Sequence, residues 1–392
     1  MRVFMICPAM VQTGGTELLH QFSKCLSDAG IENYMIYPNA DRIHCPTPPT
    51  FLKYGVKYVS SFIDASDSVL VLPETQVHLV NICKKGTVMV WWLSVANYIC
   101  EYQNLIEEEP DVFKLKGREN VVHFAQSYYA KRFVNKYFTD DKCYYLKDYI
   151  NDEIIEYASE NIAQYERENV CLYNPKKGYE VLKPIMDACR KDIVWKPLSN
   201  MKPTQMAEAM CKAKVYVDFG NHPGKDRIPR EAAVCGCCIL TNRKGSAANA
   251  EDVAIPEQYK MEDTSDISAV LAQIYDLLDH YEERIEEYTS YRDKIYGEKA
   301  EFMFDFKSAV YILEETVQRN MSQVMHDDGA QYTQILDSIS RAAGKVQELA
   351  EISKKSCYEE NYSAALDNLL TIDYLLQVIR ETAYAEIMDI VQ

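Results

Sequence analysis

Long apolar runs are missing from this 392-residue chain. No stretch approaches the roughly 20 residues that a helix needs to span a bilayer. The first ten residues carry one basic side chain and read directly into an apolar run, which makes a poor signal peptide. A disulfide framework is missing too, because the 13 cysteines are odd in number and irregularly spaced. We therefore expect a cytoplasmic protein.

Positive charge is in short supply. The chain has 42 Lys and Arg residues against 59 Asp and Glu residues, a net charge of −17. This balance disfavours nucleic acid as a partner and disfavours electrostatic docking on anionic lipid. The stretch from Lys176 to Arg230 is an exception, with 12 basic and 6 acidic residues and a net charge of +6. It indicates a small anionic ligand, unless the charges are merely solvated helix faces.

Two ligand-binding motifs are also missing. The G-x-G-x-x-G spacing of dinucleotide-binding proteins is absent, which disfavours an NAD-linked oxidoreductase. An Asp-x-Asp pair, which could bind a divalent metal, is also absent. We therefore expect neither a metal nor a cofactor.

What is present is an alternation of apolar runs and amphipathic stretches. In residues 1–150 the expected strands are Arg2–Cys7, Tyr34–Tyr37, Val69–Leu72, Val88–Leu93, Val121–Ala125 and Cys143–Leu146. Helices are expected between them, at Thr16–Ala29, Thr75–Cys83 and Tyr128–Tyr137. Continuous apolar strands are typical of a parallel sheet that is covered on both faces. The pattern predicts one doubly wound, Rossmann-like domain.

A second alternation occupies residues 151–310, after a polar connection at Asp148–Glu168. Its expected strands are Val170–Tyr173, Ile193–Trp195, Val215–Asp218 and Cys238–Thr241, with helices at Tyr179–Cys189, Thr204–Lys212 and Pro229–Cys235. The predicted fold class is α/β, with two Rossmann-like domains facing a cleft at the carboxyl ends of their strands. Clustered Cys235, Cys237 and Cys238 are expected to be small core residues, because no second cluster completes a zinc site.

Beyond about Ser265 the chain is expected to be helical. Residues 321–392 carry 12 acidic and 5 basic residues, and their apolar positions follow helix spacing. These positions are Tyr332, Ile335, Leu336, Ile339, Ala343, Val346, Leu349, Tyr362, Ala365, Leu366, Leu369, Leu370, Ile379 and Ile387. The helices must bury one face, either on the two Rossmann-like domains or on a second subunit. Self-association is the favoured alternative, because both Rossmann-like domains look complete without them.

Three segments carry the residue types that bind phosphate. Gly14-Gly15 follows the first strand and lets a ligand approach the start of the next helix. Asn174-Pro175-Lys176-Lys177-Gly178 places two ammonium groups beside another helix start, although lysines in a loop can be merely solvated. The third segment, His222–Ala233, is rich in Gly, His, Lys and Arg and leads into a helix. Its candidate ligand-binding residues are Gly224, Lys225, Arg227, Arg230 and Glu231.

This third segment resembles the donor site of family 4-like glycosyltransferases with the GT-B fold. The resemblance rests on Glu-Ala-Ala-x-x-Gly at Glu231–Gly236, the apolar strand after it and Gly245. The Lys-Lys-Gly turn and Gly14-Gly15 resemble further elements of that group, in the same order, across roughly residues 1–310. The resemblance implies that Glu231 binds the donor ribose and that Lys177 with Arg227 or Lys225 neutralises the diphosphate. It also implies a metal-independent, retaining transfer. A UDP-sugar is the favoured donor.

One position departs from the family pattern. A Glu-x7-Glu motif ending at Glu231 would place a glutamate at 223, where this chain has Pro223. The sugar-contacting carboxylate is therefore missing or supplied from elsewhere. Candidate catalytic residues are Glu74, Ser94 and His222, and each of the first two can equally be a loop or cap residue.

The leading hypothesis is an enzyme that transfers a sugar from a nucleotide-diphosphate sugar to a glycan, a lipid-linked glycan or a protein. The N-terminal domain would then hold the acceptor, and the chain could sit peripherally at the inner membrane face. The departure at Pro223 leaves a second reading open, a catalytically weak nucleotide-sugar-binding protein that assists a glycosylation complex through its C-terminal helices.

Overall fold

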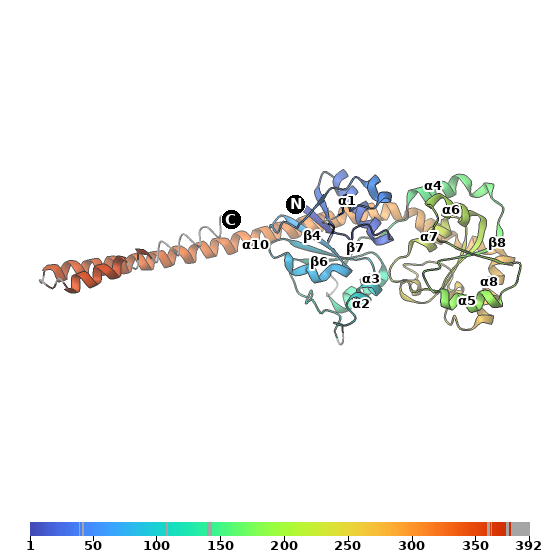
Figure 1. The fold of residues 1–392 in the computed structure, drawn as a ribbon. Coiled ribbons are helices and arrows are strands. Elements are labelled where there is room, and N and C mark those ends of the chain that lie inside the picture. The colour runs from blue at the N-terminus through green and yellow to red at the C-terminus, as the bar shows by residue number, and fades with distance from the viewer. Residues whose placement is uncertain are drawn as a thin grey trace. The chain divides into compact units, whose positions relative to one another are not determined.

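The computed structural model describes residues 1–38, 40, 43–106, 109–138, 143–358, 361, 363–373 and 376–377, with side chains described apart from 323–339, 342 and 357. The chain forms two compact units, Met1–Asn320 and Met321–Gln392. The first unit contains two parallel sheets with helices packed around each (Figure 1). The predicted α/β fold class with two Rossmann-like domains is confirmed.

The first sheet has seven strands in the order β3-β2-β1-β4-β5-β6-β7. Its strands are β1 (Arg2–Ile6), β2 (Glu32–Ile36), β3 (Tyr58–Val59), β4 (Ser68–Pro73), β5 (Thr87–Trp92), β6 (Val121–Ala125) and β7 (Cys143–Tyr145). Every paired neighbour is parallel. The central strands β4 and β5 are buried at every position, which explains their unbroken apolar sequence.

Helices cover both faces of this sheet. They are α1 (Gly14–Asp28), α2 (Val95–Glu101) and α3 (Tyr128–Tyr137), with the 3-10 helices η1 (Pro49–Tyr54) and η2 (Glu74–Ile82). Trp91 and Trp92 are adjacent on β5 and therefore point to opposite faces, so each is fully buried in a different core. The helix expected at Thr75–Cys83 is a 3-10 helix, and it follows Pro73 and the buried Glu74.

The second sheet has five strands in the order β12-β11-β10-β8-β9. They are β8 (Glu168–Tyr173), β9 (Val194–Pro197), β10 (Ala213–Asp218), β11 (Cys238–Asn242) and β12 (Lys260–Met261). Around them pack α4 (Asp152–Asn161), α5 (Tyr179–Ala188), α6 (Pro203–Lys212), α7 (Arg227–Val234) and α8 (Ile267–Asp279), with the short η3 (Ile162–Gln164), η4 (Gly245–Ala248) and η5 (Glu257–Tyr259). The edge strands β3 and β12 have two residues each and were not anticipated from the sequence.

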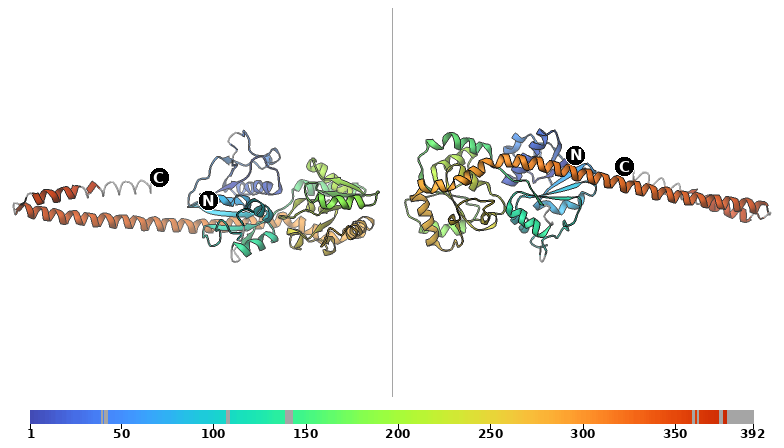
Figure 2. Two further views of the ribbon diagram at one scale, coloured as in Figure 1. Left: turned by 60° about the horizontal axis from the view of Figure 1, so that its bottom comes forward. Right: turned by 180° about the vertical axis from the view of Figure 1, so that it is seen from behind.

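After the second sheet the chain returns to the first. Following α9 (Tyr281–Arg284) and η6 (Ile285–Tyr288), helix α10 (Thr289–Tyr358) begins. Its apolar residues Phe302, Phe306, Ala309, Leu313 and Val317 join the core beside β1 and α1. Figure 2 shows this part of α10, in orange, crossing the domain of the first sheet.

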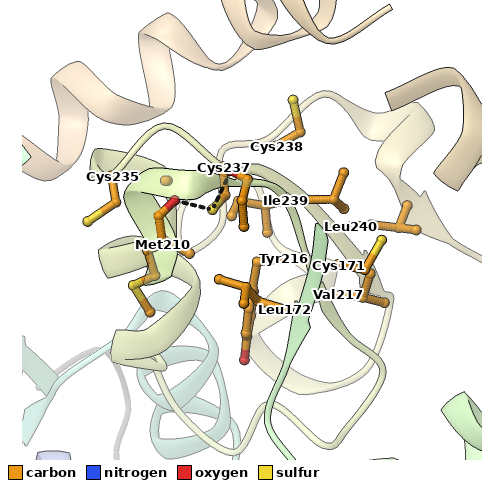
Figure 3. Packing of buried hydrophobic residues seen from close by; sticks show 14 of the residues in the cluster. Cys171, Leu172, Met210, Tyr216, Val217, Cys235, Cys237, Cys238, Ile239 and Leu240 are labelled. Atoms are coloured by element: carbon orange, nitrogen blue, oxygen red, sulfur yellow. Dashed lines mark hydrogen bonds between the residues drawn. The ribbon is translucent and has the colours of Figure 1, made fainter. Parts of the chain in front are cut away.

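The three clustered cysteines belong to the core of the second sheet. Cys235, Cys237 and Cys238 are fully buried, as predicted. Their side chains spread apart, and the thiol of Cys237 lies 3.2 Å from the carbonyl oxygen of Met210 (Figure 3). Burial raises the pKa of Cys237 to about 12, so its thiol stays protonated. The three cysteines therefore act as small core residues.

The second unit consists of the remainder of α10 and a further helical segment at 363–373. The expected apolar positions Ala343, Val346, Leu349, Ala365, Leu366, Leu369 and Leu370 lie on these helices. The predictions for Tyr362, Ile379 and Ile387, and for the side chains of Tyr332, Ile335, Leu336 and Ile339, fall outside the described residues. Within the described part of the chain, no helix has the length and apolar character required to cross a membrane.

Candidate functional site

A cleft of about 620 Å³ lies between the carboxyl ends of the two sheets. Its lining includes a large part of the residues expected from the sequence. They are Gly14, Gly15, Glu74, Ser94, Asn174, Lys177, Gly224, Lys225 and Arg227. Asn97, Gln126, Asp148, Asp218, Pro223 and Asp226 line it as well. Segments separated by more than two hundred residues in the sequence therefore meet at one site.

Four expected residues lie outside this lining, namely His222, Arg230, Glu231 and Gly245. All are close behind it. Gly245 has a left-handed backbone and supports the loop at His222, because a β-carbon there would lie 2.0 Å from the His222 carbonyl oxygen. That oxygen accepts a hydrogen bond from the Ser246 amide at 2.9 Å. The geometry gives Gly245 the task of holding the loop in place, and its contact with a donor stays a prediction.

Helices α1 and α7 both begin at the cleft. Thr13 caps α1, and its hydroxyl accepts the Thr16 amide at 3.2 Å, while Gly14 and Gly15 form the first turn. Across the cleft, Asp226 and Arg227 begin α7. Free amides and the helix dipole make each start attractive to an anion. The cleft thus presents two positive helix ends from opposite domains.

Close backbone approaches explain the glycines on the second domain. Gly178 has φ of +66°, and a β-carbon on it would lie 2.7 Å from the Gly220 amide nitrogen. A β-carbon on Gly224 would lie 2.3 Å from the carbonyl oxygen of Leu93, which belongs to the other domain. Any side chain at these positions would force the loops apart. Gly224 therefore allows the two domains to touch beside the cleft.

The cationic side chains take part in a buried chain of ion pairs. Its alternating members are Glu17, Arg227, Asp148, Arg230, Glu298 and Lys225. Arg227 reaches Glu17 at 2.5 Å and Asp148 at 2.8 Å. Arg230 reaches Asp148 at 2.7 Å and Glu298 at 2.5 Å. These six side chains are at most 15% exposed. Each buried charge among the ion pairs therefore needs an opposite charge beside it, because an unpaired buried charge destabilises the fold.

This chain of ion pairs alters the expectation for Arg230. Its guanidinium is 1% exposed and donates to Asp148, Glu298 and two backbone oxygens. Its charge therefore joins α7 to α10 and to the connection after β7. Lys225 lines the cleft, yet its ammonium also pairs with Glu298 at 2.5 Å. Of the three expected cations on this segment, Arg227 is the one whose guanidinium lies between both domains at the cleft.

Asp148 illustrates the electrostatics. Burial works to raise its pKa, but the two guanidinium groups beside it outweigh burial and hold the pKa below its usual value. The Asp148 carboxylate is therefore ionised at neutral pH. It stabilises Arg227 and Arg230 in place and so fixes the start of α7.

A second polar group lies at the carboxyl ends of β8 and β10. The Lys177 ammonium donates to both oxygens of Asp226 at 2.9 Å. His222 lies 3.3 Å from Asp226 and 3.8 Å from Asp218. Burial works to lower the pKa of His222, but the hydrogen bond to Asp226 and the charge of Asp218 raise it overall.

Ligand atoms of Asp218, His222 and Asp226 lie within 4.8 Å of one another, which is close enough to share a metal ion. Lys177 already supplies positive charge to Asp226 at this point. A divalent ion would have to compete with that ammonium for the same oxygens. The expectation of metal-independent chemistry stays a prediction.

Glu74 faces the cleft from the end of β4. Its carboxylate accepts the Leu93 amide at 2.9 Å and is 3% exposed. Burial raises the pKa of Glu74 to about 7, although the backbone amides around it work in the opposite direction. Glu74 can therefore exist in both protonation states near neutral pH, as a proton-transferring group requires. Nearby Ser94 caps α2 with its hydroxyl, which accepts the Asn97 amide at 3.1 Å.

Glu231 lies beside the chain of ion pairs, with its side chain buried. Burial raises its pKa to about 7, while Arg227 and Arg230 lower it. Glu231 lies in the first turns of α7, close to Arg227 and Arg230, but it does not line the cleft. The ribose contact implied by the resemblance stays a prediction.

Sequence reasoning missed the acidic partners, Glu17, Asp148 and Glu298. Each comes from a different element, and Arg227 is 210 residues from Glu17. A weak signal was available for Asp148, because it is the first acid after the last strand of the first sheet, at the predicted cleft edge. Glu298 offered none, since an acid on a long helix is usually solvated.

The architecture and the cleft together define the GT-B fold. Among solved structures, the chain is similar to a glycosyltransferase from Rickettsia africae, with 11% identity and a TM-score of 0.53, over 81% of this chain and 98% of that one. It is also similar to sucrose-phosphate synthase from Thermosynechococcus elongatus, with 14% identity and a TM-score of 0.53, over 84% of this chain and 99% of that one. At these identities the likeness establishes the fold.

No family model matches the sequence. No curated protein matches it either.

Proposed function

We propose that the protein is a glycosyltransferase that moves a sugar from a nucleotide-diphosphate sugar to an acceptor. The observation that carries this proposal is the arrangement of positive groups at the cleft. The helix starts of α1 and α7 face the same space, and Lys177 and Arg227 lie there too. A diphosphate is the ligand that suits two helix N-termini and two cations.

The transfer breaks the bond between the anomeric carbon and the diphosphate oxygen and forms a bond to an acceptor oxygen. Negative charge develops on the leaving diphosphate, while the proton of the acceptor hydroxyl must depart. Preorganised cations and amides at the diphosphate stabilise this charge without a divalent metal. We propose a metal-independent, retaining transfer, with a UDP-sugar as the first donor to test.

Glu74 is the proposed carboxylate on the acceptor side. It lies near the loop at Pro223, because both approach Leu93. The Leu93 amide donates to Glu74, and a β-carbon on Gly224 would lie 2.3 Å from the Leu93 carbonyl oxygen. A carboxyl group at this place can hydrogen-bond a sugar hydroxyl whether protonated or ionised. Glu74 would supply from the first domain the sugar-contacting carboxylate that is missing at Pro223 in the second domain.

The proposed acceptor is a glycan, a lipid-linked glycan or a protein. A lipid-linked acceptor would bring the enzyme peripherally to the inner face of a membrane. The two remaining site assignments, Glu231 for the donor ribose and His222 as a catalytic group, belong to the same proposal. His222 would act through Asp226, which it contacts, on the Lys177 ammonium.

A second candidate function is supported by the ion pairs at Arg227. The Arg227 guanidinium donates to Glu17, Gln21 and Asp148, so a diphosphate must compete with internal carboxylates. With proline at 223, a protein that binds a nucleotide sugar but transfers it poorly would keep this geometry. Such a protein would act as an assembly partner of a glycosylation complex.

The decisive experiment combines binding with turnover. UDP-, GDP-, ADP- and dTDP-sugars are screened for thermal stabilisation, because a ligand that binds the native state raises the melting temperature. The best donor is then titrated by calorimetry against Lys177→Ala and against Lys183→Ala, a surface lysine on α5 that pairs with Asp187. The Lys177→Ala variant loses a charge-assisted contact worth about 1.5–3 kcal/mol. It should therefore bind the donor roughly tenfold or more weakly than the unmodified chain.

Lys183→Ala should bind the donor as tightly as the unmodified chain. Equal affinity in both variants would remove Lys177 from the donor site. Release of nucleotide and sugar from the donor, or transfer to an acceptor panel, distinguishes the enzyme from the assembly partner. Clean binding without turnover favours the second candidate.

A further inference from the structure

The helical segment at 363–373 and 376–377 exposes an unusual number of leucines. Leu366 is 58% exposed, Leu369 is 52%, Leu370 is 62% and Leu376 is 50%. Leu369 and Leu370 follow Leu366 by three and four residues, and Leu376 follows them by seven and six. At this helical spacing the four side chains share one side of the helix. We call these four residues the leucine face. Isolated exposed leucines are ordinary, but an apolar row along a helix marks an interaction surface.

The adjoining side of the same segment is already occupied. Ala365 is 3% exposed, and its carbonyl oxygen accepts a hydrogen bond from the Ser353 hydroxyl of α10 at 3.5 Å. Ala364, Asn368 and Ile372 share that half-buried or buried side. Figure 1 shows this segment, in red, running alongside the end of α10. The segment therefore has two packing faces, and α10 covers one of them.

Charge indicates what covers the other face. Over residues 341–358 α10 has four basic and two acidic residues, a net charge of +2, whereas residues 363–377 have Asp367 and Asp373 and no basic residue. A second copy of this hairpin would offer a basic helix to the acidic, leucine-bearing one. On α10, Ile352 is 44% exposed. Lys345 lies seven residues before it and Lys355 three residues after it, and both lysines are exposed on the same side of the helix.

An anionic membrane fits this surface less well. Residues 321–392 have a net charge of −7, and the two acids of the leucine-bearing helix would face the headgroups. A two-helix hairpin that pairs with another copy instead produces a four-helix bundle, in which every helix buries two faces. The pairing is isologous, because each copy supplies both the acidic helix and the basic one.

We infer that the protein self-associates through its C-terminal unit, with the leucine face of one copy packed against α10 of a second copy around Ile352. This goes beyond the proposed function, because it concerns assembly and leaves the cleft untouched. The leucine face supplies the apolar contact. The opposite charges of the two helices select which helix meets which.

The test uses the full chain, whose mass is 45.2 kDa, and compares assembly by sedimentation and light scattering. The unmodified chain should have at least twice the chain mass. Leu366→Glu combined with Leu370→Glu should raise the dissociation constant about tenfold or more, which is at least 1.4 kcal/mol. The matched control is Leu105→Glu, a leucine in the first unit that is 59% exposed.

A charge exchange separates lost association from lost folding. Asp367→Lys with Asp373→Lys should weaken assembly, and adding Lys354→Glu with Lys355→Glu should restore it, at unchanged helicity by circular dichroism. A monomeric unmodified chain would overturn the inference, as would assembly that survives both leucine substitutions. Flotation of the monomer with phosphatidylcholine vesicles, abolished by Leu366→Glu and Leu370→Glu, would assign the leucine face to lipid instead.

Discussion

Each cation at the start of α7 already has a carboxylate partner inside the protein. Arg227 and Arg230 share Asp148, which is 1% exposed. Removing one member of such a buried set costs about 3–5 kcal/mol, because the remaining charge is left uncompensated. A loss of activity after Arg230→Ala would therefore say little about the donor. Lys177 is the more informative cation, since it is about one third exposed at the cleft.

Among single residues, Glu74 gives the sharpest pH prediction. Burial raises its pKa from 4.5 to about 7 in the folded protein. Between these two pH values the folded state binds more protons than the unfolded state, so stability falls as pH rises through this range. Glu74→Gln keeps the shape and an acceptor for the Leu93 amide but cannot ionise. Above pH 8 this variant should be more stable than the unmodified chain, by about 1–3 kcal/mol.

Urea unfolding at pH 5 and pH 8 measures this difference. Glu231 also has a pKa raised to about 7, so the unmodified chain and the variant should both lose stability between these pH values, the variant less. Parallel pH dependences for the two proteins would show that Glu74 is not the buried titrating group. If Glu74 also contacts the acceptor, turnover by the variant should lose its dependence on a group with a pKa near 7.

At the scale of elements, sequence reasoning succeeded where burial forces a pattern. The unbroken apolar runs of β4 and β5 follow from sheet faces that are both covered, and the strands were predicted within one residue at each end. It failed for β3 and β12, because two residues carry no periodicity. It also missed the partners of Arg227, since contacts across 210 residues depend on how the domains meet and leave no local pattern.

The loop that precedes α5 offers a test at this scale. Gly178 and Gly55 both have a left-handed backbone, with φ of +66° and +60°. A β-carbon on Gly178 would meet the backbone of Phe219 and Gly220 at 2.7 Å, whereas nothing lies within 4 Å of one on Gly55. Gly55→Ala should cost only the backbone strain, about 1 kcal/mol. Gly178→Ala adds a collision between two loops and should cost about 2 kcal/mol more.

Denaturant midpoints of the two variants give the comparison directly. Gly178→Ala should also weaken nucleotide-sugar binding, because Lys177 precedes the displaced residue. Gly55→Ala should leave binding unchanged. Equal costs for the two substitutions would mean that the loops at Gly178 and Gly220 yield without penalty.

At the scale of the first unit, the domains are joined by α10, whose apolar residues enter both cores, and by polar contacts around the cleft. The Gln126 side chain accepts the Lys225 amide at 2.9 Å, and Arg227 reaches Glu17. Asp252 of the second domain accepts the amides of Tyr128 and Tyr129 at 2.7 and 2.9 Å, at the start of α3 in the first domain. A donor that binds between these contacts would be enclosed by both domains, so their strength bears on how the cleft opens and closes.

Asp252 stabilises the start of a helix in one domain from the other domain. Asp252→Ala removes two hydrogen bonds and the charge at the α3 N-terminus, which should cost about 1–2 kcal/mol. Asp266→Ala is the matched control, since Asp266 caps α8 within its own domain by accepting the Ala269 amide at 3.0 Å. Both variants should lose similar stability. Only Asp252→Ala should loosen the contact between the domains, seen as faster exchange of the Tyr128 and Tyr129 amides and as easier proteolysis near the cleft. If Asp266→Ala increases exchange at those amides equally, the effect comes from general destabilisation, and Asp252 has no particular part in holding the domains together.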